Sequence, residues 1–169
     1  YELDQLLEAG VHGIVFGALL PSGEPDISFL QEIKNRVGAI SLTCHRAIDV
    51  ARNSLDMLDV LIQIGFQRIL SSGEKNKAID GLENLKQMVE KSKNRIEIMA
   101  GSGVNSENCL EFIKIGCHAV HFSAKKTIHG QMDYKKPGIS MGGIDGISEY
   151  DVFFASEEEI RRVVEIVGS

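Results

Sequence analysis

The sequence SLTCHRAID at residues 41–49 decides how the fold of this chain is predicted. It continues an apolar, strand-like segment that begins at Val37, and it ends in a histidine, an arginine and an aspartate. An amphipathic, helix-like segment follows. Titratable side chains at the carboxyl end of a parallel strand are typical of the sites of α/β proteins. We therefore asked whether the rest of the chain repeats this arrangement.

The same pattern of apolar strand, polar loop and amphipathic helix occurs five times. The predicted strands are Gly13–Leu19, Ala39–His45, Arg68–Ser72, Ile96–Ala100 and Ala119–Ser123. The predicted helices are Leu3–Ala9, Ile27–Val37, Ser54–Ile64, Ala78–Lys91, Ser106–Ile115 and Glu157–Val167. The spacing is that of βα units, which build either a doubly wound sheet or a barrel.

Polar strand ends on every unit, without a glycine-rich dinucleotide turn, favour a (β/α)8 TIM barrel. A complete barrel needs about 250 residues, and this chain has 169. We expect residues 1–169 to be a single TIM-barrel domain that contains roughly the last five βα units, with the N-terminal units missing. The glycine-rich segment Ile128–Gly146 is predicted to be a long loop before the final helix.

Composition limits the classes of partner. The net charge is -6 and no basic stripe is present, which argues against nucleic acid as a partner. No apolar run reaches the roughly 18 residues of a membrane-spanning helix. The three cysteines have no CxxC spacing, which is typical of reduced thiols and predicts a cytoplasmic protein.

Alternation along the strands sorts the candidate residues. Val120 and Phe122 should face the helices, so that His121 and Ser123 point into the barrel. By the same rule His45 points inward and lies over the same cavity as His121, whereas Cys44 faces the helices. Cys44 then has the position of a small core residue, and the alternative is a metal ligand or nucleophile.

Two further predictions follow from the strands. Arg68 and Glu97 should lie on neighbouring strands at similar depth and form a buried ion pair, because buried charges are normally paired. Loops at the carboxyl ends of the last strands are a common place for an anion in barrels. The candidate anion-binding residues are Ser72, Gly73, Gly101, Gly103 and Ser123. The alternative is that these glycines are present for steric reasons.

Several stretches together resemble the CutC copper homeostasis proteins over essentially the whole chain. They are residues 13–19 (GIVFGAL), 45–49 (HRAID), 65–73 (GFQRILSSG), 101–104 (GSGV) with Asn108, and 121–124 (HFSA). The resemblance implies a cytosolic, oligomeric TIM-barrel protein linked to copper handling, with copper as its ligand. It also implies an N-terminal third that precedes this chain.

Three functions remain open from the sequence. The first is a copper homeostasis protein that binds copper, with Cys44 as the candidate metal ligand, although copper(I) selects several soft ligands and the cysteines are dispersed. The second is a barrel enzyme acting on a small anionic or phosphorylated substrate. Its candidate catalytic residues are His45 or His121 as general acid or base, Arg46 as the anion clamp, and Asp49 as the group that orients either Arg46 or His45. The third is a non-catalytic interaction protein.

Overall fold

The computed structural model describes residues 2–136, 138, 148 and 150–168. The chain divides into two compact units, Tyr1–Phe122 and Ser123–Ser169.

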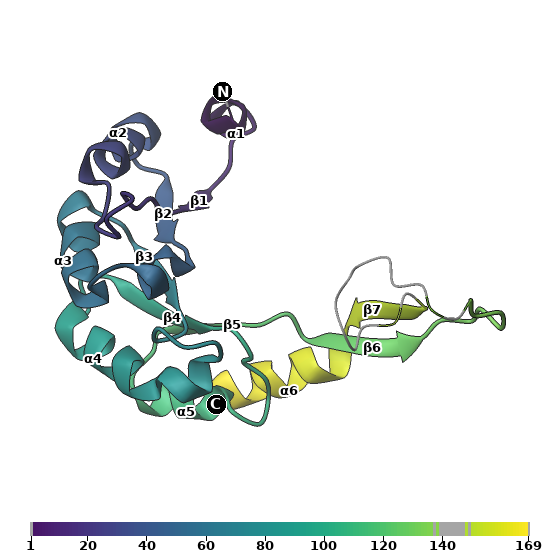
Figure 1. Ribbon diagram of the computed structural model, residues 1–169. Coiled ribbons are helices and arrows are strands. Elements are labelled where there is room, and N and C mark those ends of the chain that lie inside the picture. Colours follow the sequence, from purple (N-terminus) through teal and green to yellow (C-terminus); the bar gives the residue numbers. More distant parts are fainter. Residues whose placement is uncertain (1, 137, 139–147, 149, 169) are drawn as a thin grey trace. The chain divides into compact units, whose positions relative to one another are not determined.

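The first unit alternates strands with helices (Figure 1). Its elements are α1 (Glu2–Glu8), β1 (Gly13–Phe16), α2 (Ile27–Val37), β2 (Ser41–Cys44), the 3-10 helix η1 (Arg46–Val50), α3 (Ser54–Ile64), β3 (Arg68–Ser71), the 3-10 helix η2 (Ala78–Gly81), α4 (Leu82–Ser92), β4 (Glu97–Gly101), α5 (Cys109–Lys114) and β5 (Ala119–His121). The strands form one parallel sheet in the order β1-β2-β3-β4-β5. Five consecutive parallel βα units were predicted, and this α/β architecture is confirmed.

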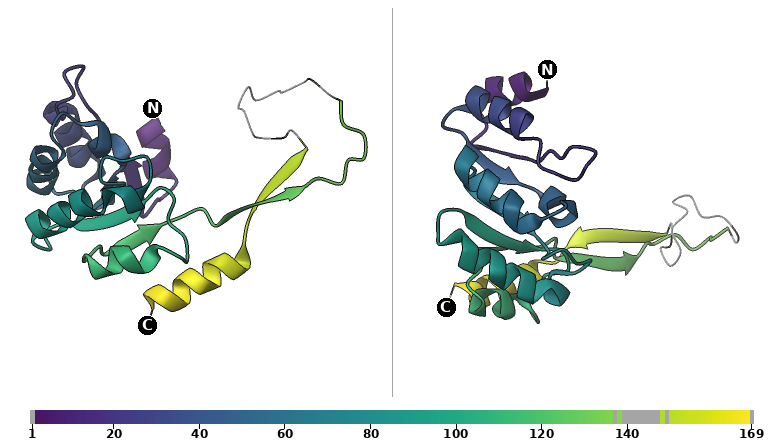
Figure 2. Two further views of the ribbon diagram at one scale, coloured as in Figure 1. Left: turned by 60° about the horizontal axis from the view of Figure 1, so that its bottom comes forward. Right: turned by 60° about the vertical axis from the view of Figure 1, so that its left-hand side comes forward.

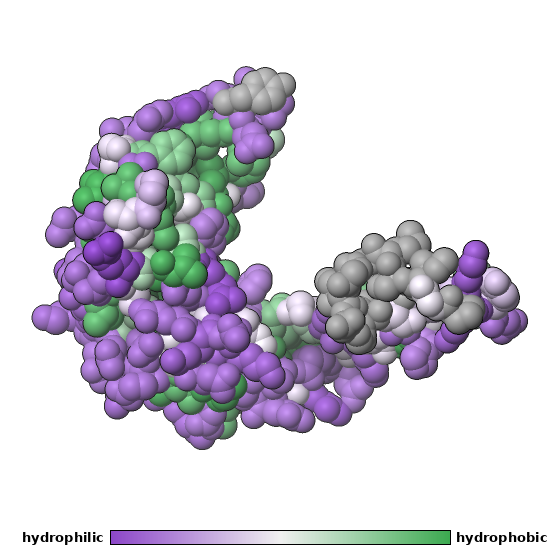
Figure 3. Space-filling view, in the orientation of Figure 1, coloured by the Kyte–Doolittle hydropathy of each residue, from purple (hydrophilic) through white to green (hydrophobic). Residues whose placement is uncertain are grey.

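Helices α2 to α5 lie along one side of the curved sheet, and the opposite side of the strands is left open (Figures 1 and 2). Side chains that alternate toward the helices form the core. Leu42, Ile69 and Ile98 have no exposed surface, and they lie on three neighbouring strands. The opposite face is more exposed, as Val15 at 61% shows, and hydrophobic residues are visible along the inner side of this unit (Figure 3). The predicted alternation is therefore correct for β2, β3 and β4, whereas Val120 in β5 is only partly buried.

Capping residues explain where the longer helices begin and end. The Asp26 carboxylate accepts a hydrogen bond from the Phe29 N–H at 3.0 Å, and Asn53 accepts from Leu55 and Asp56 at the start of α3. Helix α3 ends at Gly65, which has a φ of 93° in the left-handed region. Helix α5 begins at Cys109, three residues later than the sequence predicts. The turn before it is organised by Asn105, whose side chain accepts from two following N–H groups.

The Arg68–Glu97 pair forms, but its predicted burial is wrong. The two residues are register partners on β3 and β4, and Arg68 Nε lies 2.7 Å from Glu97 Oε2. Their side chains are 40% and 48% exposed. The pair lies on the open face of the sheet, where no described layer of side chains covers it.

The second unit contains strands β6 (Lys125–His129) and β7 (Asp151–Ala155) and helix α6 (Glu157–Val167). The strands pair in an antiparallel ribbon, and Ser156 caps α6 by accepting from the Glu159 N–H. The sequence predicts a loop from residue 128, but Ile128 and His129 belong to β6. Residues 137 and 139–146 of that predicted loop lie outside the described residues.

Candidate functional site

The carboxyl ends of β2 and β3 are joined by a network around the Asp49 carboxylate. Asp49 lies in η1, directly after β2, and its side chain is only 3% exposed. Its oxygens accept hydrogen bonds from Ser71 Oγ at 2.5 Å, from the Ser72 N–H at 3.0 Å and from the Glu74 N–H at 3.3 Å. Arg46 Nε donates to Asp49 Oδ2 at 2.7 Å. Asp49 therefore holds the loop after β3 against the end of β2.

The ionised form of Asp49 is favoured by this network. Burial opposes ionisation, but the hydrogen bonds from Ser71, Arg46 and Ser72 together hold the pKa of the Asp49 carboxyl below its usual value. A carboxylate that accepts several hydrogen bonds is a structural anchor as well as a charge. The predicted contact between Asp49 and Arg46 is present, and the catalytic role given to both residues stays a prediction.

Arg46 is already engaged by protein atoms. Besides its bond to Asp49, Arg46 Nη2 donates to Ser72 Oγ at 2.7 Å and to the Lys75 carbonyl at 3.0 Å. The arginine side chain is 42% exposed. Because its Nε and Nη2 groups are engaged in this way, Arg46 fixes the loop after β3 in this structure, and only its outer edge can meet a ligand.

His45 and His121 lie on different parts of the sheet. The His45 ring accepts the Ala47 N–H through Nδ1 at 3.1 Å, which leaves the proton on Nε2. Gly17, after β1, makes room for this ring, since a Cβ there would lie 3.1 Å from His45 ring atoms. His121 is exposed at the end of β5. Two strands separate β2 from β5, which is roughly 14 Å along the sheet at about 4.8 Å per strand. No hydrogen bond joins the two histidines in the described part of the chain.

The glycines predicted to bind an anion have different structural roles. Gly73 packs against Gly81 so closely that a Cβ on Gly73 would lie 2.2 Å from the Gly81 carbonyl oxygen. Gly101 is the last residue of β4, and a Cβ there would lie 2.5 Å from Leu70 Cδ1. Steric need explains Gly73, whose neighbour is backbone, whereas the atom nearest to Gly101 is the end of the flexible Leu70 side chain, and the anion-binding role of Gly101 stays a prediction. Gly103 differs from them, because it is exposed and has a φ of +71° in the loop after β4.

Two serines complete the predicted anion-binding set. Ser72 is fully buried, and its hydroxyl lies 2.9 Å from Asp49 Oδ2. In this structure Ser72 therefore supports the loop. Ser123 is exposed and belongs to the second unit. The anion-binding role of both residues stays a prediction.

The loop after β4 is held in place on both sides, and two of its N–H groups, one at exposed Gly103 and one at buried Val104, have no acceptor among the described residues. Ser102 Oγ donates to the Asn76 carbonyl at 2.6 Å, and the Ala78 N–H donates to the Ser102 carbonyl at 2.9 Å. Asn108 Nδ2 donates to the Gly103 carbonyl at 2.9 Å. Within the described residues, the N–H groups of Gly103 and Val104 have no acceptor. Ordered, unpaired amides of this kind can receive an anion.

Cys44 does not have the properties of a metal ligand. The residue is fully buried, and its thiol lies 3.3 Å from the His45 carbonyl oxygen. Burial raises the pKa of the Cys44 thiol to about 12. Copper(I) is held by several soft ligands, and in the described part of the chain no three His, Cys, Asp or Glu side chains form a group that could hold a metal ion. The residues present therefore do not fit a copper site.

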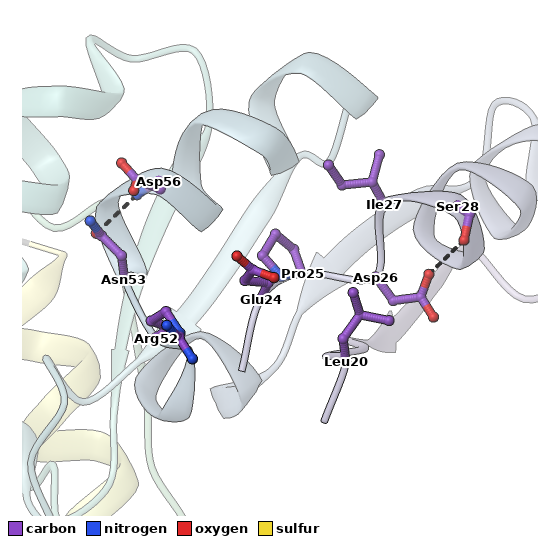
Figure 4. A pocket seen from close by; sticks show the side chains of 9 residues that line it. All are labelled: Leu20, Glu24, Pro25, Asp26, Ile27, Ser28, Arg52, Asn53 and Asp56. Atoms are coloured by element: carbon purple, nitrogen blue, oxygen red, sulfur yellow. Dashed lines mark hydrogen bonds between the residues drawn. The ribbon is translucent and has the colours of Figure 1, made fainter. Parts of the chain in front are cut away.

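A separate pocket lies between the beginnings of α2 and α3, with a volume of about 520 Å³ (Figure 4). Asp26 and Asn53 line it, and both are occupied as helix caps. Arg52 also lines it and donates from Nε to the Ser22 carbonyl at 3.1 Å. The sequence did not point to this pocket, because its walls come from caps and a tight turn that carry no catalytic pattern.

No helix within the described ranges is long and apolar enough to cross a membrane.

The profile of the CutC family matches residues 2–126. A relative from Bacteroides fragilis, described as a family protein CutC, is 34% identical over 169 residues, which are 99% of this chain and 67% of that protein. One from Photorhabdus laumondii with the same description is 37% identical over 149 residues, which are 88% of this chain and 60% of that protein.

Two solved structures are similar to this chain. The structure named "Putative Copper Homeostasis Protein CutC from Streptococcus agalactiae" matches with a TM-score of 0.67 and 29% identity. The match covers 71% of this chain and 60% of the Streptococcus agalactiae chain. Thiamine phosphate pyrophosphorylase from Pyrococcus furiosus matches with a TM-score of 0.52 and 19% identity, over 72% of this chain and 55% of that chain. The second match shows the fold alone, and the structural neighbours are TIM-barrel proteins.

Proposed function

Because the chain belongs to the CutC family, we propose that it takes part in copper homeostasis. The support is the family match together with the name of the Streptococcus agalactiae structure. The three cysteines are free thiols, which suits a reducing cytoplasm, and we place the protein there. Assembly as a homo-oligomer is part of the same proposal and rests on the family resemblance. The chain spans about two thirds of the length of its Bacteroides fragilis relative, so these proposals concern the whole protein.

At the molecular level, we propose that the barrel mouth binds a small oxyanion, such as a phosphorylated substrate. The observation that carries this proposal is that the Gly103 and Val104 amides have no acceptor among the described residues, in a loop fixed by Ser102 and Asn108. Amides that are already ordered bind an anion without a further loss of backbone entropy. The described residues favour this ligand over a copper ion, because Cys44 is buried and no thiol cluster is formed among them.

The reaction, if the site is catalytic, would use the groups nearest the mouth. His45 carries its proton on Nε2 and can act as general acid or base, and His121 is a second exposed imidazole. Asp49 and Arg46 act on the loop after β3 and position it. In this proposal the loop after β4 binds the anionic ligand, and His121 lies at the end of the neighbouring strand β5, whereas His45 lies two strands away from β4.

Two titrations test the proposal. Inorganic phosphate added to the ¹⁵N-labelled full-length protein at constant ionic strength should shift the Gly103 and Val104 amide signals in a saturable manner. Shifts that are absent or spread over the whole chain would refute anion binding at this loop.

Copper(I) is titrated in parallel against the protein and against a Cys44→Ser variant, with a competing chelator. We expect equal, weak binding by both. Tight binding that disappears in the variant would show that Cys44 is a copper ligand and would contradict the conclusion that the described residues do not fit a copper site.

Copper homeostasis is tested in cells that lack the gene. We expect the full-length protein to restore growth on raised copper, and an Asp49→Asn variant to restore it less well, because the loop after β3 loses its anchor. A deletion strain with unchanged copper tolerance would contradict the cellular role.

A further inference from the structure

The strongest unexplained feature near the loop after β4 is Lys77. Its side chain crosses Gly103, since a Cβ at Gly103 would lie 3.3 Å from Lys77 Cγ and 3.6 Å from Lys77 Cδ. Lys77 is exposed, and its ammonium group takes part in no ion pair or hydrogen bond within the described residues. The aliphatic part of the side chain is thus fixed over Gly103, while the ammonium group has no partner among the residues that the structure describes.

The backbone on both sides of Lys77 is fixed to the same loop. The Asn76 carbonyl accepts from Ser102 Oγ at 2.6 Å, and the Ala78 N–H donates to the Ser102 carbonyl at 2.9 Å. Lys77 itself is extended, with a φ of -120° and a ψ of 140°. Its side chain therefore leaves a backbone segment that cannot move independently of the loop after β4.

The reach of the side chain matches the position of the free amides. Nζ lies two bonds beyond Cδ, about 2.5 Å further out at ordinary bond lengths. An oxyanion that accepts from the Gly103 N–H has its oxygens about 2.9 Å from that nitrogen. The Lys77 ammonium can contact an anion in that position. A cation and two amides on one anion combine charge with directional hydrogen bonds.

We propose that Lys77 is a binding residue for the oxyanion, and that its ammonium closes over the anion held by the Gly103 and Val104 amides. This inference rests on the anion site proposed above. It explains why an uncharged stretch such as Gly101–Val104 could attract an anion in a chain with a net charge of -6. It also explains why the loop after β3 must be fixed, since that loop carries Lys77. Asp49 and Arg46 would act on the ligand only through this positioning.

The experiment compares phosphate binding by the full-length protein and three variants. Lys77→Met keeps most of the aliphatic side chain over Gly103 and removes the charge, and Lys77→Arg keeps the charge. Lys86→Gln is the matched control, because Lys86 is an exposed lysine on α4 whose only ion pair among the described residues, with Glu90, is 4.0 Å long. The ¹⁵N spectrum of each variant shows whether it is folded, and the Gly103 amide shift gives the dissociation constant for inorganic phosphate at constant ionic strength.

We expect Lys77→Met to weaken phosphate binding by roughly three- to tenfold, as for loss of a partly exposed charged contact. Lys77→Arg and Lys86→Gln should stay within about twofold of the parent. Equal binding by Lys77→Met and Lys86→Gln would overturn the role of Lys77 and leave the anion site standing. If the parent protein shows no saturable shift at Gly103, the anion site itself fails, and the role of Lys77 fails with it.

Discussion

Replacing Asp49 by asparagine should destabilise the fold more than any other change of a single charge at the barrel mouth. The Asp49 carboxylate accepts from Arg46, Ser71, Ser72 and Glu74, and it is 3% exposed. The asparagine side chain has the size of aspartate but only one acceptor oxygen. Its NH2 group would face the N–H and O–H donors that now contact the Asp49 carboxylate. Disrupting a buried charge pair costs about 3–5 kcal/mol. Arg46 is 42% exposed, so we expect the lower limit, about 3 kcal/mol.

The loss should depend on pH in a defined direction. The pKa of Asp49 is lower in the folded protein, so its ionised form stabilises the fold at pH values above its unfolded pKa of about 3.9. This stabilisation is lost as the pH falls through the lowered, folded-state pKa. The difference in unfolding free energy between parent and Asp49→Asn should be full at pH 7 and should shrink below about pH 4.

Urea unfolding followed by circular dichroism measures both effects. With a slope of about 2 kcal/mol/M, a loss of about 3 kcal/mol lowers the midpoint by about 1.5 M. Asp80→Asn is the control, because Asp80 is an exposed aspartate in η2 of the same loop region and should change the midpoint little. The reasoning is refuted if Asp49→Asn unfolds at the same urea concentration as the control at pH 7. A pH-independent difference would show that the lost contacts do not depend on the charge.

Three further changes test other parts of the structure. Gly73→Ala or Gly81→Ala should destabilise the protein by about 3 kcal/mol or more, because each Cβ would collide with the facing backbone. An unchanged melting temperature in either variant would contradict this close packing. Cys44 should react with a maleimide at pH 8 only as fast as the protein unfolds, since burial raises the pKa of its thiol to about 12; rapid labelling of the native protein would contradict this. Arg68→Met should cost less than about 1 kcal/mol in urea unfolding, because the Arg68–Glu97 pair is half exposed; a cost above about 2 kcal/mol would show that the open face is covered in solution.

Much of the first unit could be predicted from local patterns. The bounds of α2 and α3 agree with the sequence prediction. For α3 the reason is that Asn53 and Gly65 mark the two ends of an amphipathic run. The alternation of β2 correctly placed Cys44 among the helices. The β6–β7 ribbon was missed, because its two strands are separated by a long segment and no short turn signals a hairpin.

The succession of βα units, the face of the sheet on which the residues of β2 to β4 lie, and the likeness to the CutC family could all be read from the sequence. These properties depend on residues close together in the chain, through periodicity and capping. Three contacts are visible only in the folded chain. Arg46 and Asp49 fix the loop after β3, the backbones of Gly73 and Gly81 are in close contact, and the Lys77 side chain crosses Gly103. Each of these contacts joins separate loops or turns, and its partners meet only when parallel strands bring their carboxyl ends to the same edge of the sheet.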